Sequence, residues 1–242
     1  MNFKLLDGTG DVQVATNKVT KQVAITGKGQ FFEKNHQWFT KAIPWSTRIL
    51  VPFKSAKRKG VSIDLDIDLA KAQSKLPSPL DTKTLENKTM TVNTVIDNNL
   101  VNSELNLPGL VNVNLTWKEQ QGGFKLISNK VWLGSLPQTS KNKQNAFYIK
   151  GEIERLSLDD WIPISKKLNF SSQNDNEGSK KVIWDESSVL VKNTQFLSHD
   201  YSDLQISLKS NVDKPLAINL TNKDVEASVS FSSANCHCTL YS

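Results

Sequence analysis

Apolar and polar residues alternate along most of the chain, and this period of two is typical of β-strands that bury one face. The clearest example is residues 61–69, where valine, isoleucine and leucine alternate with serine and aspartate. Residues 111–117, 147–153, 204–208, 216–220 and 225–231 alternate in the same way. Hairpins are expected at residues 12–25 and at residues 90–96 with 100–107, and further strands at residues 124–132 and 182–196. The sequence therefore predicts a mainly β protein, with an extended antiparallel meander. Residues 36–53 carry two prolines, so we expect an extended or edge segment there.

One short helix is expected at residues 158–168, where the alternation stops after a strand. Asp159 is a candidate N-cap, and Pro163 falls where the first turn of a helix tolerates proline. Trp161 is expected to pack against the sheet. The two prolines of residues 76–80 favour a rigid extended corner there, because proline disfavours helix both at its own position and at the preceding one.

Polar stretches suggest how the chain is divided. Residues 1–170 are expected to form one β segment that ends in the short helix. Residues 171–181 are polar and charged and predict a mobile loop. Residues 182–231 predict a β-meander that continues the same sheet, and residues 232–242 are expected to be an unstructured tail.

Composition adds little to this picture. Hydrophobic residues make up 38% of the 242-residue chain and the mean hydropathy is −0.40, as expected when strands bury only one face. The net charge of +6 and the pI of about 9.2 mildly favour anionic partners. There is no apolar run near 18 residues, so no transmembrane helix is expected, and the first ten residues lack the features of a signal peptide.

No group of residues predicts catalysis or metal binding. Asp64, Asp66 and Asp68 alternate with apolar residues and lack the glycine turn of a calcium loop, so a solvated acidic strand face explains them better. Residues 236–238 read Cys-His-Cys, without the second pair of ligands that structural zinc sites use. None of the three histidines lies in a known catalytic motif. We therefore expect a protein that is not an enzyme and has no metal and no cofactor.

A compact basic group is the other candidate for a contact site. Lys54, Lys57, Arg58 and Lys59 can contact an anionic partner such as the phosphates of a lipid headgroup. A solvated turn between two strands explains the same residues. The sequence leaves both interpretations open.

The order of the motifs resembles the AsmA-like family and, within it, the YhdP group of large bacterial envelope proteins. Residues 61–69 followed by the Leu-Pro-Ser-Pro-Leu corner at residues 76–80 are similar to one segment of that group. Residues 45–52, residues 151–161 (GEIERLSLDDW) and residues 197–231 resemble others. Members of the group are longer and begin with a membrane-anchoring helix, so the resemblance implies that this chain is a fragment of such a protein.

The resemblance implies a β-sheet curled into a groove with an apolar lining, anchored at the inner membrane, crossing the periplasm and implicated in phospholipid transport between the inner and outer membranes. Expected partners are phospholipid acyl chains and the rest of the full-length groove protein, and not nucleic acid. The apolar positions of the alternating strands would line the groove: Val61, Ile63, Leu65, Ile67, Val113, Leu115, Ile149, Ile153, Leu204, Leu208 and Ile218.

Alternation alone leaves a second architecture open, since an apolar sheet face fits a closed core as well as a groove. The alternative is a closed β-sandwich, an adhesin-like binding domain that contacts an anionic partner through the basic group. The groove interpretation also predicts unpaired strand edges at residues 2–6 and 225–231, where the fragment would self-associate.

Overall fold

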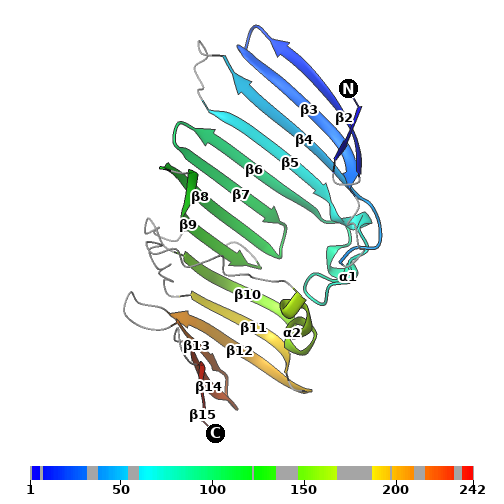
Figure 1. Cartoon of the computed structure of the whole chain (residues 1–242). Helices are drawn as coiled ribbons and strands as arrows, with labels where there is room; N and C mark the ends of the chain where they lie inside the picture. The colour runs from blue at the N-terminus through cyan, green and yellow to red at the C-terminus, as the bar shows by residue number, and fades with distance from the viewer. Residues whose placement is uncertain are drawn as a thin grey trace. The chain divides into compact units, whose positions relative to one another are not determined.

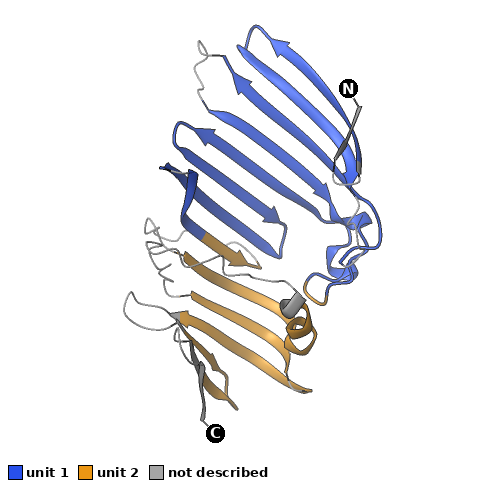
Figure 2. Cartoon of the chain, viewed as in Figure 1, with its two compact units in different colours: residues 1–76, 80–129 blue, residues 77–79, 130–242 orange. Residues whose placement is uncertain are grey.

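The computed structural model describes residues 2–5, 8–31, 38–53, 60–121, 123–134, 147–167, 187–196, 198–209, 216–231 and 236–241 (Figure 1). The chain forms two compact units, residues 1–76 with 80–129 and residues 77–79 with 130–242 (Figure 2). Both units are mainly β, and the order of strands in the sheet follows the order of the chain. The prediction of a mainly β fold is therefore confirmed.

Unit 1 is a sheet of sequential strands. Its described elements are β1 (Asn2–Leu5), β2 (Gly8–Asn17), β3 (Gln22–Phe31), β4 (Ile43–Pro52), β5 (Val61–Asp68), η1 (Leu69–Lys71), α1 (Thr82–Leu85), β6 (Thr89–Asp97), β7 (Leu100–Leu107) and β8 (Val111–Gln120). The strand β9 (Gly123–Leu133) begins in unit 1 and ends in unit 2. Each strand from β1 to β7 pairs with the next in antiparallel register. The turn between β6 and β7 uses Asn98 at a φ of 50°, as its Asp-Asn-Asn sequence predicts.

Of the two possibilities expected for residues 36–53, β4 is an extended segment and not an edge, because it pairs with both β3 and β5. The amide of Phe53 donates to the Lys21 carbonyl on the β3 side, so the positions of Pro44 and Pro52 face the β5 side. Pairing with β5 extends only from Trp45 to Leu50. The prolines therefore lie just beyond the ladder, where a missing N–H costs no strand hydrogen bond.

The buried core of unit 1 lies at one end of its strands. Here residues 38–42, 69–76 and 80–88, which we call the cap, pack against the strand ends (Figure 1). The cluster consists of Ile43, Leu69, Ala72, Leu85 and Leu107, with half-buried Phe31, Phe39, Ile67, Leu80, Met90, Leu110 and Val111 around it. The cap contains two helices that the sequence did not predict, η1 and α1. Asp68 and Asp81 are their N-caps and accept hydrogen bonds from the amides of Ala70 (3.2 Å) and Thr84 (2.8 Å).

Unit 2 contains a mixed sheet. Its further elements are β10 (Phe147–Ser157), α2 (Leu158–Lys167), β11 (Ser187–Phe196), β12 (His199–Lys209), β13 (Leu216–Thr221), β14 (Glu226–Phe231) and β15 (Cys236–Tyr241). From β11 to β15 neighbouring strands are antiparallel, but β10 and β11 are parallel. The described strand pairs are thus predominantly antiparallel, as expected, and β10 and β11 are parallel because a crossover that includes α2 returns the chain to the same end of the sheet.

The helix α2 is present where expected, but its first turn differs from the prediction. The Ser157 hydroxyl, not Asp159, is the N-cap and accepts from the Asp160 amide at 3.3 Å. Asp159 instead accepts from the Ser198 amide at 2.9 Å, which joins the helix to the turn before β12. Pro163 lies inside the helix rather than in its first turn. The half-buried Trp161 donates from its indole N–H to the Ser78 carbonyl at 2.8 Å.

The expectation of an unstructured tail was wrong for residues 236–241, which form β15. In this strand Cys236 lies opposite Phe231, and Cys238 lies opposite Val229. Cysteine is a small apolar residue, so these positions continue the alternation of the preceding strands. The strand with Val229 is consequently paired on both sides and is not an open edge. The polar loop predicted at residues 171–181 lies outside the described residues.

Candidate functional site

One face of the unit 1 sheet is almost entirely apolar. Residues opposite each other in neighbouring strands share a face, so the strand register fixes its membership. We call it the apolar face: Val23, Ile25, Trp45, Thr47, Ile49, Val51, Val61, Ile63, Leu65, Ile67, Met90, Val92, Thr94, Ile96, Val101, Ser103, Leu105, Val113, Leu115 and Trp117. The structure therefore brings together six residues predicted from sequence as one lining: Val61, Ile63, Leu65, Ile67, Val113 and Leu115.

The opposite face of the same strands is polar. Asp64 lies opposite Arg48 and Asn93, and Glu104 lies opposite Asn93 and Asn114. The carboxylate of Glu104 accepts from the side-chain amide of Asn112 at 3.0 Å. Side-chain hydrogen bonds link neighbouring strands on this face, where Asn93 and Glu104 are exposed and Asn112 is 3% exposed.

The apolar face is open away from the cap. At the cap Ile43 is 1% exposed and Leu107 is 4% exposed, whereas Ile63, Leu65 and Val113 are only half-buried. Both described helices of unit 1 lie at the cap, where η1 packs on β4 and β6 and Leu85 of α1 joins the core cluster. A closed sandwich would bury the middle of the face as completely as the cap buries Ile43. The described part of unit 1 therefore has the open arrangement.

The few hydroxyl groups on this face have partners within it. The Thr47 hydroxyl donates to the Asp64 carbonyl at 2.8 Å, and those of Thr94 and Ser103 lie 2.7 Å apart. A hydroxyl group that already has a hydrogen-bond partner costs less to cover with an apolar ligand than an unpaired one. These groups therefore leave the face suited to apolar contacts.

The Trp45 ring lies close to two glycines at the cap end of the face. A Cβ atom built on Gly27 would lie 3.3 Å from the Trp45 ring, and one built on Gly29 would lie 3.0 Å from it. Larger side chains at these positions would lift the indole off the strand. This close approach lies within β3.

In unit 2, the predicted lining residues also share one face. Ile153 lies opposite Val191, which lies opposite Leu204, and Leu208 lies opposite Ile218. Ile149 precedes Ile153 by four residues in β10 and so points to the same side. However, Val191 and Leu204 are 0% and 4% exposed, so this part of the face is packed against protein rather than open.

Both units contain charged groups. The Lys192 ammonium contacts the carboxylates of Glu152 at 2.7 Å and Glu154 at 3.7 Å, and these interactions raise the pKa of Lys192. A hollow of about 1040 Å³ at the cap has a mixed lining of charged, polar and apolar residues: Gln30, Thr40, Lys41, Ala42, Pro44, Ala70, Lys71, Gln73, Thr82, Lys83 and Glu86. The predicted basic group of Lys54, Lys57, Arg58 and Lys59 lies outside the described residues.

In the described part of the chain, no helix has the length and apolar character needed to cross a membrane.

These features define a mainly β protein with an open sheet whose apolar face lies largely uncovered in unit 1. The family model of the YhdP protein matches residues 3–239. The chain therefore belongs to the YhdP protein family, which is the family that its motifs resemble, and it is an envelope protein of the AsmA-like type. No curated protein and no solved structure matches the chain.

Proposed function

We propose that the apolar face of unit 1 binds phospholipid acyl chains, and that the chain is part of a periplasmic protein, anchored at the inner membrane, that moves phospholipid between the inner and outer membranes. The observation that supports this function is the uncovered middle of the face, where residues such as Ile63 and Leu65 are half-buried although their cross-strand neighbours are apolar. Contiguous exposed apolar surface of this kind marks a site of contact with a partner or ligand.

The energy available from such contacts is large enough for lipid binding. Covering apolar surface contributes about 25 cal/mol per Å², so about 300 Å² of newly covered surface contributes about 7 kcal/mol before the cost of ordering the ligand. The proposed ligand is an acyl chain because the face offers no charged side chain and its hydroxyl groups are already hydrogen-bonded. We further propose that the chain acts by binding rather than by catalysis, and that it does not bind nucleic acid.

Two neighbouring residues of β6 provide a matched test. Val92 lies on the apolar face between Leu65 and Leu105, whereas Asn93 lies on the polar face between Asp64 and Glu104. Val92→Lys and Asn93→Lys each add one positive charge to the same strand. The purified 242-residue chain would be incubated with phosphatidylglycerol vesicles, separated from them, and examined by native mass spectrometry.

We expect bound phospholipid on the unmodified chain and on Asn93→Lys, and at least a tenfold loss on Val92→Lys, because a lysine in the middle of the face would have to be desolvated by the acyl chain. Far-UV circular dichroism checks that both variants keep the β fold. Equal lipid binding by the two variants, or no lipid on the unmodified chain, would contradict the proposed function.

A further inference from the structure

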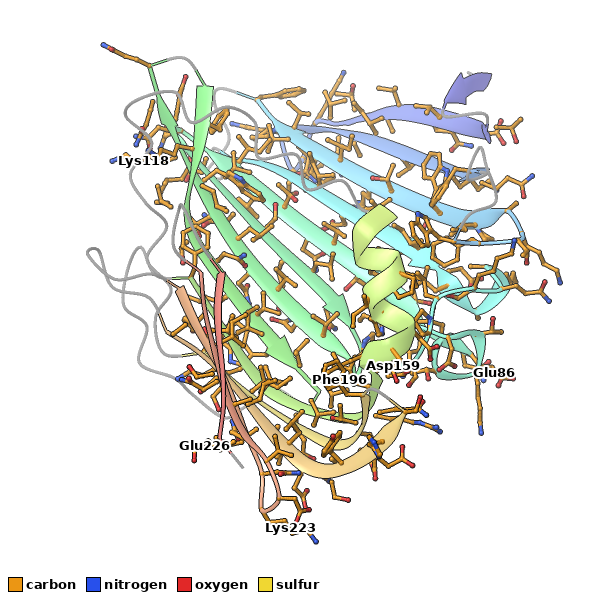
Figure 3. The ribbon with its side chains drawn as sticks, turned by 60° about the horizontal axis from the view of Figure 1, so that its bottom comes forward. Glu86, Lys118, Asp159, Phe196, Lys223 and Glu226 are labelled. Carbon is orange, nitrogen blue, oxygen red and sulfur yellow. The ribbon has the colours of Figure 1, made fainter. Side chains whose placement is uncertain are left out.

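We infer that a glycerophospholipid lies along the strands of unit 1, with its acyl ends toward the cap and its headgroup at the opposite ends of the strands. This inference rests on the proposed function and adds the orientation of the ligand. The opposite ends, which we call the polar rim, comprise the turn at residues 17–21, the turn at residues 97–99 and residues 118–121. Lys118, at the rim, and Glu86, in the cap, lie at opposite ends of the unit 1 strands in Figure 3.

The cap closes the apolar face at one end. Three cross-strand pairs mark this end: Phe31 with Ile43, Ile67 with Met90, and Leu107 with Val111. All six residues belong to the core cluster or pack against it, together with Leu69 and Leu85 of the cap helices. A phospholipid headgroup at this end would have to displace completely buried side chains, whereas the end of an acyl chain would extend the existing apolar contacts.

The polar rim has the opposite character. Every described residue of its three segments is exposed, and its charged groups are of both signs: Lys18, Lys21, Asp97, Lys118 and Glu119. Apolar residues also lie there, since Val19 is 92% exposed and Phe53, whose amide bonds to the Lys21 carbonyl, is 37% exposed. Mixed charges beside exposed apolar side chains suit the boundary between a headgroup and its acyl chains.

The length of the face fits one layer of acyl chains. From Ile67 at the cap to Val61 near the rim, β5 advances six residues, which is about 20 Å at about 3.4 Å per residue. The hydrocarbon core of a bilayer is about 30 Å thick, so the chains of one leaflet span about 15 Å. A single phospholipid can therefore lie along the strand direction with its chain ends at the cap.

Two tryptophans report on the two ends of the face. Trp45 lies opposite Ile67, near the cap, and Trp117 lies opposite Val101, near the rim. The intact chain would be labelled with 5-fluorotryptophan, and the ¹⁹F signals of these two residues would be assigned with Trp45→Phe and Trp117→Phe. Phosphatidylcholine carrying a nitroxide either on the headgroup or near the end of an acyl chain is then added, with the chemically reduced lipid as the diamagnetic control.

We expect the chain-end nitroxide to broaden the Trp45 signal at least threefold more than the Trp117 signal, and the headgroup nitroxide to broaden the Trp117 signal more. The reverse order, or equal broadening of both signals by each lipid, would overturn the orientation while leaving acyl-chain binding intact. Absence of broadening at both residues with both lipids would overturn the proposed function together with the orientation.

Discussion

The hydroxyl oxygens of Thr94 and Ser103 lie 2.7 Å apart on the apolar face of unit 1, in directly opposite positions of β6 and β7. Their cross-strand neighbours on the same face are Ile63 and Leu115. Each hydroxyl thus has a partner from the neighbouring strand, although apolar side chains lie on both sides. The pair explains how two polar residues lie within the face without requiring water there.

The two hydroxyl groups should contribute to the free energy of unfolding as a pair, so that the effects of replacing them are not additive. We expect Thr94→Val or Ser103→Ala alone to lower the free energy of unfolding by about 1 kcal/mol, because each leaves a half-buried hydroxyl without its partner. The double variant should be less destabilised than the sum, with a coupling of about 0.5–1.5 kcal/mol. Urea unfolding followed by circular dichroism measures the cycle, and additive effects would show that the two hydroxyls do not interact.

The glycines under Trp45 should differ in their tolerance of a methyl group. A Cβ on Gly29 would meet the backbone of Thr9 and Gly10, whereas one on Gly27 would first meet a Thr47 side-chain methyl at 3.1 Å. Backbone in a paired strand yields less readily than a side chain, so Gly29→Ala should be about 1–3 kcal/mol more destabilising than Gly27→Ala. Thermal unfolding of the two variants compares them, and equal melting temperatures would contradict the close approach of β2 and β3.

The indole of Trp161 should help to hold the segment of residues 77–79 on α2. Trp161→Phe removes the hydrogen bond to the Ser78 carbonyl, and we expect a local loss of about 1 kcal/mol. Amide hydrogen exchange of peptides that cover α2 should become about fivefold faster. Ile162→Leu, at a side chain that is 41% exposed in the same helix, is the control and should leave the exchange unchanged.

The pKa values of two lysines of unit 2 should differ from the ordinary lysine pKa in opposite directions. The hydrogen bond to Glu152, with the charges of Glu152 and Glu154, raises the pKa of Lys192, whereas burial lowers the pKa of Lys130. The raised pKa means that Lys192 stabilises the folded chain below pH 10.5 and that this contribution is lost as the pH rises through the folded pKa. The lowered pKa of Lys130 means that its charge destabilises the folded chain at lower pH and that this cost is lost as the pH rises to 10.5 and above. An NMR titration of the lysine side chains should give the higher pKa for Lys192, and Glu152→Gln should lower it toward 10.5.

Most strands could be predicted from the sequence because a half-buried strand leaves a period of two, as at residues 61–69. The cap could not be predicted in the same way. Its helices η1 and α1 have three and four residues, too few to show a helical period. Its contacts also join distant parts of the chain, such as the Thr40 amide and the Gln73 carbonyl at 3.2 Å.

The candidate site shows the same division between local pattern and long-range packing. The sequence placed Ile63 and Leu65 on one face correctly, because alternation alone determines the face of a strand. It could not distinguish Ile63, which is half-buried, from Leu204, which is 4% exposed, because both lie at apolar positions of alternating strands. Whether such a face is covered depends on elements distant in the sequence, and only the structure shows them.

Site-specific photo-crosslinking tests the central claim most directly. A benzoylphenylalanine would be placed singly at Leu65 or Val113 on the apolar face, and at the neighbouring Asp66 or Asn114 on the polar face. After irradiation of the chain with phosphatidylglycerol vesicles, mass spectrometry would identify covalent phospholipid adducts. We predict adducts at Leu65 and Val113 and at least tenfold less adduct at Asp66 and Asn114. Equal labelling of the two faces, or no adduct at Leu65 and Val113, would contradict acyl-chain binding on the apolar face.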